Sequence, residues 1–287
     1  MPTDLRNRLF EELDSLVLID PHTHIDALSP ASRDLSEILG YHYYTELAHS
    51  AGLPRQQIEA PGITPREKVG LLLNNLEPIQ NTIQYSWLIE MCRKFFGFEG
   101  KIINGSNWES IYDAAQAKMD EPDWSEQVLK QSGIEAVFLT NDFDDSLEGF
   151  DTSVYIPCLR TDDLVFHLAK PAVRERLEIC TNISLESLGA LTQSLEHLFT
   201  HFTRENAKAC AISLPPWFIP REIHFGEAEK ALVQIQSHGE QAAPEHKETM
   251  ACWVFWKLTE LCDEFRLPFD LMIGAVSYTH LTLPTKA

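Results

Sequence analysis

Basic residues are scarce in this sequence, which has 23 Lys and Arg against 43 Asp and Glu and a formal net charge of −20. This excess of negative charge argues against nucleic acid or an anionic membrane as a partner, because both are negatively charged themselves. An anionic substrate would need a local positive group, which a metal ion or an arginine could supply. The charge balance therefore directs attention to individual cations rather than to a basic surface.

Long apolar runs and paired cysteines are also missing. No apolar stretch approaches the ~20 residues that span a bilayer, and residues 1–20 lack the basic start and uninterrupted apolar run of a signal peptide. The six cysteines form no CxxC pair, and most lie in apolar surroundings, which suits buried, reduced thiols in a cytosolic protein. We therefore expect a cytoplasmic protein without a membrane partner.

The chain has enough apolar material for a folded core, since 44% of its 287 residues are hydrophobic. It contains neither internal repeats nor a low-complexity tract. Its length suits one α/β barrel or two smaller domains.

Two histidines follow a short apolar run near the start of the chain. Residues 16–19 are Leu-Val-Leu-Ile, which predicts a buried strand, and Asp20 and Pro21 lead from it into His22 and His24. Because side chains alternate along a strand, the two imidazoles should point to the same side. Two imidazoles at the end of a strand can bind one divalent metal. Two solvated histidines at a strand end are the structural alternative.

The rest of the chain alternates between helical and strand patterns. Apolar residues at helical spacing predict helices at residues 4–15, 34–52, 66–98, 107–119, 124–132, 162–179, 184–206, 226–237 and 245–266. After the first strand, β-type runs predict strands at residues 133–140, 154–159, 207–214 and 267–274. Alternation of this kind favours a parallel sheet, and a (β/α)8 barrel with about five of its strands present fits best.

About a hundred residues separate the first strand from the second, far more than an ordinary connection between a strand and a helix. We therefore expect a helical insertion at residues 34–132 within a single, incomplete barrel domain at residues 1–275. Residues 276–287 continue neither a helical nor a strand pattern. They are interpreted as a tail foreign to the domain, and a genuine C-terminal tail is the alternative.

Polar residues follow three of the predicted strands. His22 and His24 follow the first, Asn141 and Asp142 follow the second, and Arg160 ends the third. Active sites of such barrels lie at the carboxyl ends of the strands, so these side chains should share one face.

The sequence Val-Leu-Ile-Asp-Pro-His-Thr-His at residues 17–24 resembles the first barrel strand of the amidohydrolase superfamily. Within that superfamily the chain most resembles the uronate (glucuronate) isomerases, which have a distorted (β/α)8 barrel with a helical insertion after the first strand. The resemblance covers residues 5 to about 275. The matching segments keep their order along the chain and are residues 17–24, 40–43, 81–87, 95–97, 140–147 and 157–162.

The sequence departs from the family pattern at several positions. Asn141 and Phe143 stand where the family has Asp and Pro, and Pro215 and Met272 stand where it tends to have histidines. Thr45 and Glu46 likewise replace a tryptophan and an arginine. The chain therefore resembles a divergent branch.

The resemblance implies a metal-assisted aldose–ketose isomerase acting on a hexuronate, either D-glucuronate to D-fructuronate or D-galacturonate to D-tagaturonate. His22 and His24 would hold a divalent metal, with Zn²⁺ as the expected ion. Arg160 would pair with the substrate carboxylate, a bidentate contact that lysine cannot reproduce.

Further roles follow from the same resemblance. His42, Tyr43 and Asp142 are the candidate catalytic residues, with His42 and Tyr43 donating hydrogen bonds to sugar hydroxyls, and Asn141 joins Arg160 as a candidate for substrate binding. The proton-transferring carboxylate of the family lies on its last strand, beyond this chain, so residues 1–287 alone are expected to be inactive. The resemblance leaves a homo-oligomer open.

Structural roles are the alternatives for these residues. His42 and Tyr43 could cap and pack a helix, Asp142 could bond its own turn, and Arg160 could pair with Asp162 or Asp163. Two other functions also stay open, namely a metal-dependent hydrolase of the same superfamily and a non-catalytic, degenerate barrel.

Overall fold

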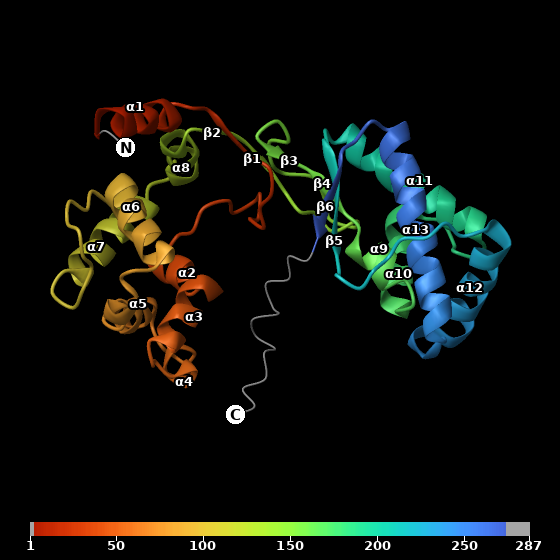
Figure 1. The fold of residues 1–287 in the computed structure, drawn as a ribbon, viewed down its shortest axis with the longest axis horizontal. Helices are drawn as coiled ribbons and strands as arrows, with labels where there is room; N and C mark the ends of the chain where they lie inside the picture. Colours follow the sequence, from red (N-terminus) through yellow and green to blue (C-terminus); the bar gives the residue numbers. More distant parts are fainter. Residues whose placement is uncertain (1–2, 274–287) are drawn as a thin grey trace. The chain divides into compact units, whose positions relative to one another are not determined.

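The computed structural model describes residues 3–273, in which short parallel strands alternate with helices (Figure 1). The chain divides into two compact units. The first comprises Met1–Leu18 and Ile25–Glu135, and the second comprises Ile19–His24 and Ala136–Ala287.

The first unit is helical. Its helices are α1 (Thr3–Asp14), α2 (Leu35–Leu39), α3 (His42–Ser50), α4 (Arg55–Ile58), α5 (Pro65–Leu73), the 3₁₀ turn η1 (Glu77–Ile79), α6 (Ile83–Phe96), α7 (Trp108–Met119) and α8 (Trp124–Ser132). Between residues 34 and 132 the structure describes helices and no strand, as the sequence predicted.

Local capping explains where these helices begin. The Asp34 side chain accepts a hydrogen bond from the Ser36 backbone N–H at 2.6 Å and caps α2. The predicted helix at 66–98 is divided, because Pro78 has no backbone N–H and the Thr82 hydroxyl caps a new helix at Tyr85 N. Residues 34–52 are also divided into two helices, which meet at Gly40.

The strands are β1 (Leu18–Asp20), β2 (Ile134–Phe138), β3 (Tyr155–Ile156), β4 (Cys158–Arg160), β5 (Ala209–Leu214) and β6 (Phe269–Ile273). The helices of the second unit are α9 (Asp162–Phe166), α10 (Pro171–Thr181), α11 (Leu188–Arg204), α12 (Phe225–His238), the 3₁₀ turn η2 (Gly239–Gln241) and α13 (Pro244–Glu264). All five predicted strands are thus present, the third as two short pieces.

Pro157 divides the third predicted strand into β3 and β4, because proline has no backbone N–H to donate. The strands form two three-stranded sheets, ordered β1-β2-β3 and β4-β5-β6. The hydrogen bonds nevertheless continue past Pro157, because Leu139 N donates to Ile156 O at 2.9 Å and Asn141 N donates to Cys158 O at 3.0 Å. The ends of β2 and β4 are therefore neighbours. The fold is α/β with parallel strands, and the described residues form no closed barrel.

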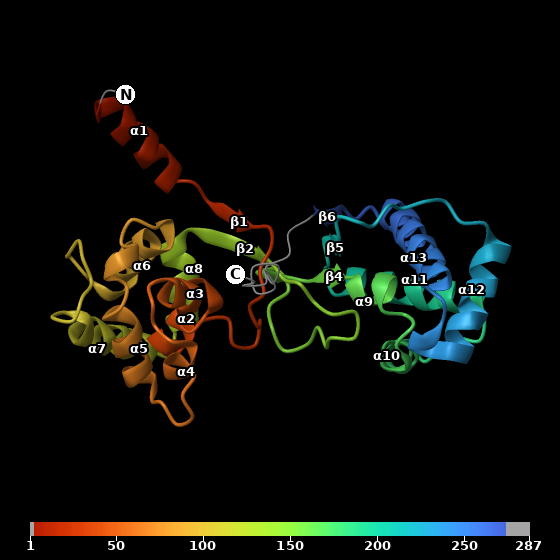
Figure 2. The ribbon, with the colours of Figure 1, turned by 60° about the horizontal axis from the view of Figure 1, so that its bottom comes forward.

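The helices after β4 enclose the core of the second unit. Helix α13 packs against α9, α11 and α12, and Figure 2 shows these helices gathered on the side of β4, β5 and β6. Leu159, Leu195, Phe199 and Leu258 are almost fully buried there. This packing holds the strands whose carboxyl ends carry the polar residues.

The sequence predicted that the first strand is buried, and this prediction is wrong. Leu18 and Ile19 are 47% and 59% exposed. The reason is that β1 lies at the end of its sheet, where β2 is its one neighbour among the described strands. The short apolar run therefore correctly indicated a strand but not its burial.

Five of the six thiols are buried, Cys180 is exposed, and all six are free, in agreement with the expected reduced cysteines. No helix within residues 3–273 is both long and apolar enough to span a membrane. The predicted tail at 276–287 lies outside the described residues.

Candidate active site

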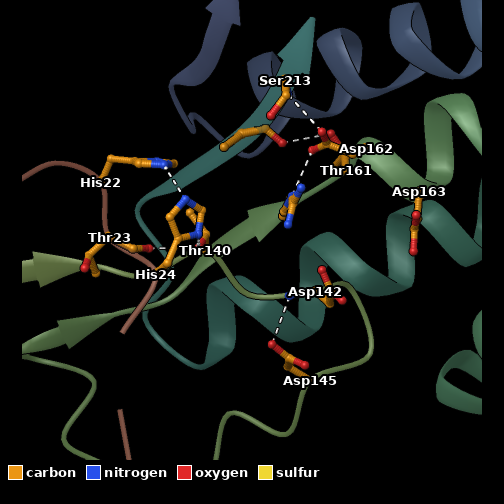
Figure 3. Close-up of polar contacts among 12 residues, drawn as sticks. His22, Thr23, His24, Thr140, Asp142, Asp145, Thr161, Asp162, Asp163 and Ser213 are labelled. Carbon is orange, nitrogen blue, oxygen red and sulfur yellow. Dashed lines mark hydrogen bonds and ion pairs between the residues drawn. The ribbon is translucent and has the colours of Figure 1, made fainter. Parts of the chain in front are cut away.

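His22 and His24 meet directly after β1. The Asp20 carboxylate accepts a hydrogen bond from His22 N at 3.2 Å and turns the chain there. The two Nε2 atoms then lie 3.3 Å apart, with the rings perpendicular and their centroids 4.9 Å apart (Figure 3). The expected placement of both imidazoles on one side of the chain is confirmed.

Thr140 ties this histidine segment to the chain beyond β2. Its hydroxyl donates to Thr23 O at 2.8 Å and lies 2.9 Å from His24 Nδ1, as Figure 3 shows. Thr23 N also donates to Phe138 O at 3.0 Å. These contacts hold the segment in place although it lies outside a regular strand.

The donor set fits a divalent metal. Two nitrogens that each lie ~2.05 Å from a tetrahedral ion are ~3.3 Å apart, which is the observed Nε2 separation. Partial burial lowers the pKa of His24, and the positive charges of His22 and Arg160 lower it further. A lowered pKa favours the neutral imidazole that binds metals. Within the described part of the chain no third His, Cys, Asp or Glu completes a ligand set.

Arg160 ends β4 and contacts a carboxylate two residues later. Its Nε lies 3.2 Å from Asp162 Oδ2, and its side chain is 41% exposed. Asp162 also accepts a hydrogen bond from Ser213 N at 3.3 Å, which links the guanidinium to β5. The suggested ion pair with Asp162 is thus present, whereas Asp163 pairs with Arg176 at 2.8 Å.

Asn141 is occupied by contacts between strands. Its backbone carbonyl accepts a hydrogen bond from Arg160 N at 2.9 Å, and its side-chain oxygen accepts one from Cys158 N at 3.3 Å. Asn141 therefore fixes the backbone of Arg160 in the sheet.

Asp142 lies in an ion-pair network centred on Arg176 of α10. The Arg176 guanidinium is 3.4 Å from the Asp142 carboxylate, also pairs with Asp144 and Asp163, and lies over the Phe143 ring at 4.7 Å. The backbone of Asp142 bonds within the turn, because Asp142 N donates to the Asp145 carboxylate at 2.9 Å and Asp142 O accepts from Asp145 N at 3.0 Å, whereas the Asp142 carboxylate contacts Arg176. Arg176 thereby fixes the loop after β2.

His42 and Tyr43 begin α3 in the first unit, whereas the other five candidate residues belong to the second. The Tyr43 ring packs edge-on against Tyr41, with 5.2 Å between centroids.

The sequence matches the model of one protein family over almost its whole length. The family model described as glucuronate isomerase (UxaC) matches residues 1–285. The chain belongs to the glucuronate isomerase family.

Individual relatives agree with this assignment. The uronate isomerase of Nostoc punctiforme is 28% identical over 230 residues, covering 71% of this chain and 48% of that protein. The uronate isomerase of Lachnospira eligens is 25% identical over 233 residues, covering 74% and 48%. The chain thus spans about half the length of these curated relatives.

Solved structures of the family share the fold. The uronate isomerase from Thermotoga maritima matches with a TM-score of 0.83 at 19% identity, over 96% of this chain and 63% of that one. The glucuronate isomerase from Caulobacter crescentus matches with a TM-score of 0.81 at 18% identity, over 95% and 62%.

The sequence did not single out two residues that hold the site together, namely Thr140 and Arg176. Thr140 directly precedes the candidate Asn141, which was the available signal. Arg176 lies in mid-helix, 34 residues after Asp142, so no local pattern marks it.

Proposed function

We propose that this chain is part of a metal-assisted hexuronate isomerase that converts D-glucuronate to D-fructuronate or D-galacturonate to D-tagaturonate. The observation that carries the proposal is the meeting of His22 and His24 Nε2 at 3.3 Å, in a chain of the glucuronate isomerase family. In the reaction a proton moves from C2 to C1 through an enediol, so that the C1 aldehyde becomes an alcohol and the C2 alcohol becomes a ketone.

The proposal includes the architecture. Strands β1 to β6 would be five consecutive strands of a (β/α)8 barrel, with β3 and β4 as one strand divided at Pro157. Residues 1–275 would be a single domain with residues 34–132 inserted. Two observations support this arrangement. The backbone hydrogen bonds continue past Pro157, from Leu139 N to Ile156 O and from Asn141 N to Cys158 O. The side chains of β1 are exposed, as expected of a strand with one described neighbour.

Each candidate residue has a role in the proposal. His22 and His24 would hold the divalent metal, Zn²⁺ by expectation, which when bound would stabilise negative charge on the substrate oxygens. Arg160 would pair with the substrate carboxylate through the guanidinium nitrogens that Asp162 leaves available. His42 and Tyr43 would donate hydrogen bonds to sugar hydroxyls.

Asn141 and Asp142 would act by positioning. Asn141 would support Arg160 through the backbone contact at 2.9 Å, and Asp142 would hold Arg176 and the loop after β2. The proton would then be moved by a carboxylate outside the described residues, as the family resemblance implies. We also propose a cytoplasmic location, which the free thiols support.

The test is an isomerase assay on two proteins. One is the 287-residue chain, and the other joins residues 1–275 to the part of the Nostoc punctiforme uronate isomerase that this chain does not match. The second protein, once shown to be folded by circular dichroism, should interconvert a hexuronate and its keto acid, and the first should not. If the folded second protein hydrolysed amide or ester substrates but isomerised neither uronate, the isomerase proposal would be wrong.

A further inference from the structure

The Thr140 hydroxyl faces two acceptor-capable groups but has a single proton. It lies 2.8 Å from Thr23 O and 2.9 Å from His24 Nδ1. A carbonyl oxygen can only accept, so the hydroxyl proton goes to Thr23 O. The Thr140 oxygen must then accept from His24, which requires a proton on Nδ1.

This proton count determines the other side of the ring. A neutral imidazole with its proton on Nδ1 has a lone pair on Nε2. That lone pair faces His22 Nε2 at 3.3 Å. Without a metal, His22 must therefore donate from Nε2, because two facing lone pairs would repel.

We propose that Thr140 is a positioning residue that fixes the Nδ1–H tautomer of His24 and so presents Nε2 to the metal. That this tautomer serves metal binding rests on the proposed function. Groups that hydrogen-bond the far nitrogen of a metal-binding histidine fix its tautomer and ring orientation in this way.

The two histidines consequently differ in how they would accept a cation. His24 already has the required lone pair. His22 has to release its Nε2 proton or move it to Nδ1. Metal binding should therefore change the protonation of His22 and leave that of His24 unchanged.

The experiment uses the 287-residue chain labelled with ¹⁵N-histidine and kept above the ordinary histidine pKa of about 6.5. Long-range ¹H–¹⁵N correlation spectra report which ring nitrogen carries the proton. The metal-free protein should show His24 protonated on Nδ1 and His22 on Nε2. Thr140→Val, which keeps the shape and removes the hydroxyl, should give His24 a mixture of tautomers.

Two further variants separate this role from a general loss of stability. Thr140→Ser restores a hydroxyl and should restore the single tautomer. Thr259→Val is the matched control, since the Thr259 hydroxyl donates to the Phe255 carbonyl within α13 at 3.0 Å. It should leave both histidines unchanged.

A Zn²⁺ titration provides the second readout. Thr140→Val should weaken Zn²⁺ binding by about 10- to 100-fold, the range found for such supporting contacts, and Thr140→Ser should bind as the natural chain does. A His24 that carries its proton on Nε2, or that keeps one tautomer in Thr140→Val, would overturn the inference. If the tautomers behave as stated but no variant binds Zn²⁺, the tautomer assignment stands and the proposed metal centre fails.

Discussion

Arg160 Nε lies 3.2 Å from Asp162 Oδ2, so a carboxylate of the same segment orients the guanidinium that ends β4. Asp162 is itself held by the backbone N–H of Ser213 on β5. The arginine is therefore fixed at one edge, through Nε, while its side chain stays 41% exposed. This geometry suits a residue that pairs with an incoming anion.

Replacing Arg160 with lysine should impair uronate use far more than stability. A charge-assisted hydrogen bond contributes about 1.5–3 kcal/mol, which corresponds to about a 10- to 100-fold loss in kcat/KM. A partly exposed ion pair contributes about 1 kcal/mol or less to folding. The measurement uses the protein that joins residues 1–275 to the Nostoc punctiforme segment. Its kinetics on both uronates and its melting temperature are compared with and without Arg160→Lys. Equal kinetics for Arg160→Lys and the unmodified protein would refute the role.

Removing the Arg176 charge should destabilise the second unit. Arg176→Met leaves Asp142, Asp144 and Asp163 without their shared cation, and each is partly exposed. We expect a loss of about 1–2 kcal/mol in unfolding free energy, measured with urea. Arg55→Met is the control, because the Arg55–Glu59 pair is a single, exposed pair on α4, and it should change stability by less than about 0.5 kcal/mol. Similar effects of both variants would contradict the network.

Asp145 should make the chain less stable as pH rises. Burial raises the pKa of its carboxyl above the ordinary 3.8, and the nearby Asp142 and Asp144 charges add to this. A carboxyl with a raised folded-state pKa contributes its full stability below the unfolded pKa and loses it as pH rises through the folded pKa.

Asp145→Asn keeps an oxygen for Asp142 N but does not titrate. Its stability relative to the unmodified chain should therefore increase from about pH 4 upward and then level off above the raised pKa of Asp145. Urea unfolding across this pH range measures the difference. A relative stability that falls with rising pH would show that the shift has the opposite sign.

Gly70 should resist replacement by alanine despite the better helix propensity of alanine. A Cβ at Gly70 in α5 would lie 2.8 Å from the Trp108 ring of α7. We expect Gly70→Ala to cost about 1–3 kcal/mol through overpacking. Gly226→Ala in α12 meets no atom within 4 Å and should instead stabilise by up to about 1 kcal/mol. Thermal unfolding of both variants tests the contrast, and a stabilised Gly70→Ala would contradict the packing.

The sequence predicted the elements well and their contacts less well. Apolar periodicity placed α13 and β5 within a few residues, because the core of the second unit depends on those patterns. It also predicted that His22 and His24 lie together, since alternation along an extended chain requires this.

The remaining features depend on distant parts of the chain. Thr140 is 116 residues from His24, and Arg176 is 32 residues from Asp144, so neither contact leaves a local pattern. The burial of residues 16–19 was predicted wrongly, because an apolar run indicates a strand but does not specify how many neighbours cover it.

In the proposed isomerase, His22 and His24 hold the metal that hexuronate isomerisation needs. The most direct test measures D-glucuronate and D-galacturonate conversion by the joined protein after chelation and after the return of Zn²⁺, alongside a His22→Ala/His24→Ala variant of unchanged circular dichroism. We predict that chelation abolishes turnover, that Zn²⁺ restores it, and that the double variant stays inactive with Zn²⁺ present. Full activity of the double variant, or turnover that persists without metal, would show that these histidines do not hold a catalytic metal.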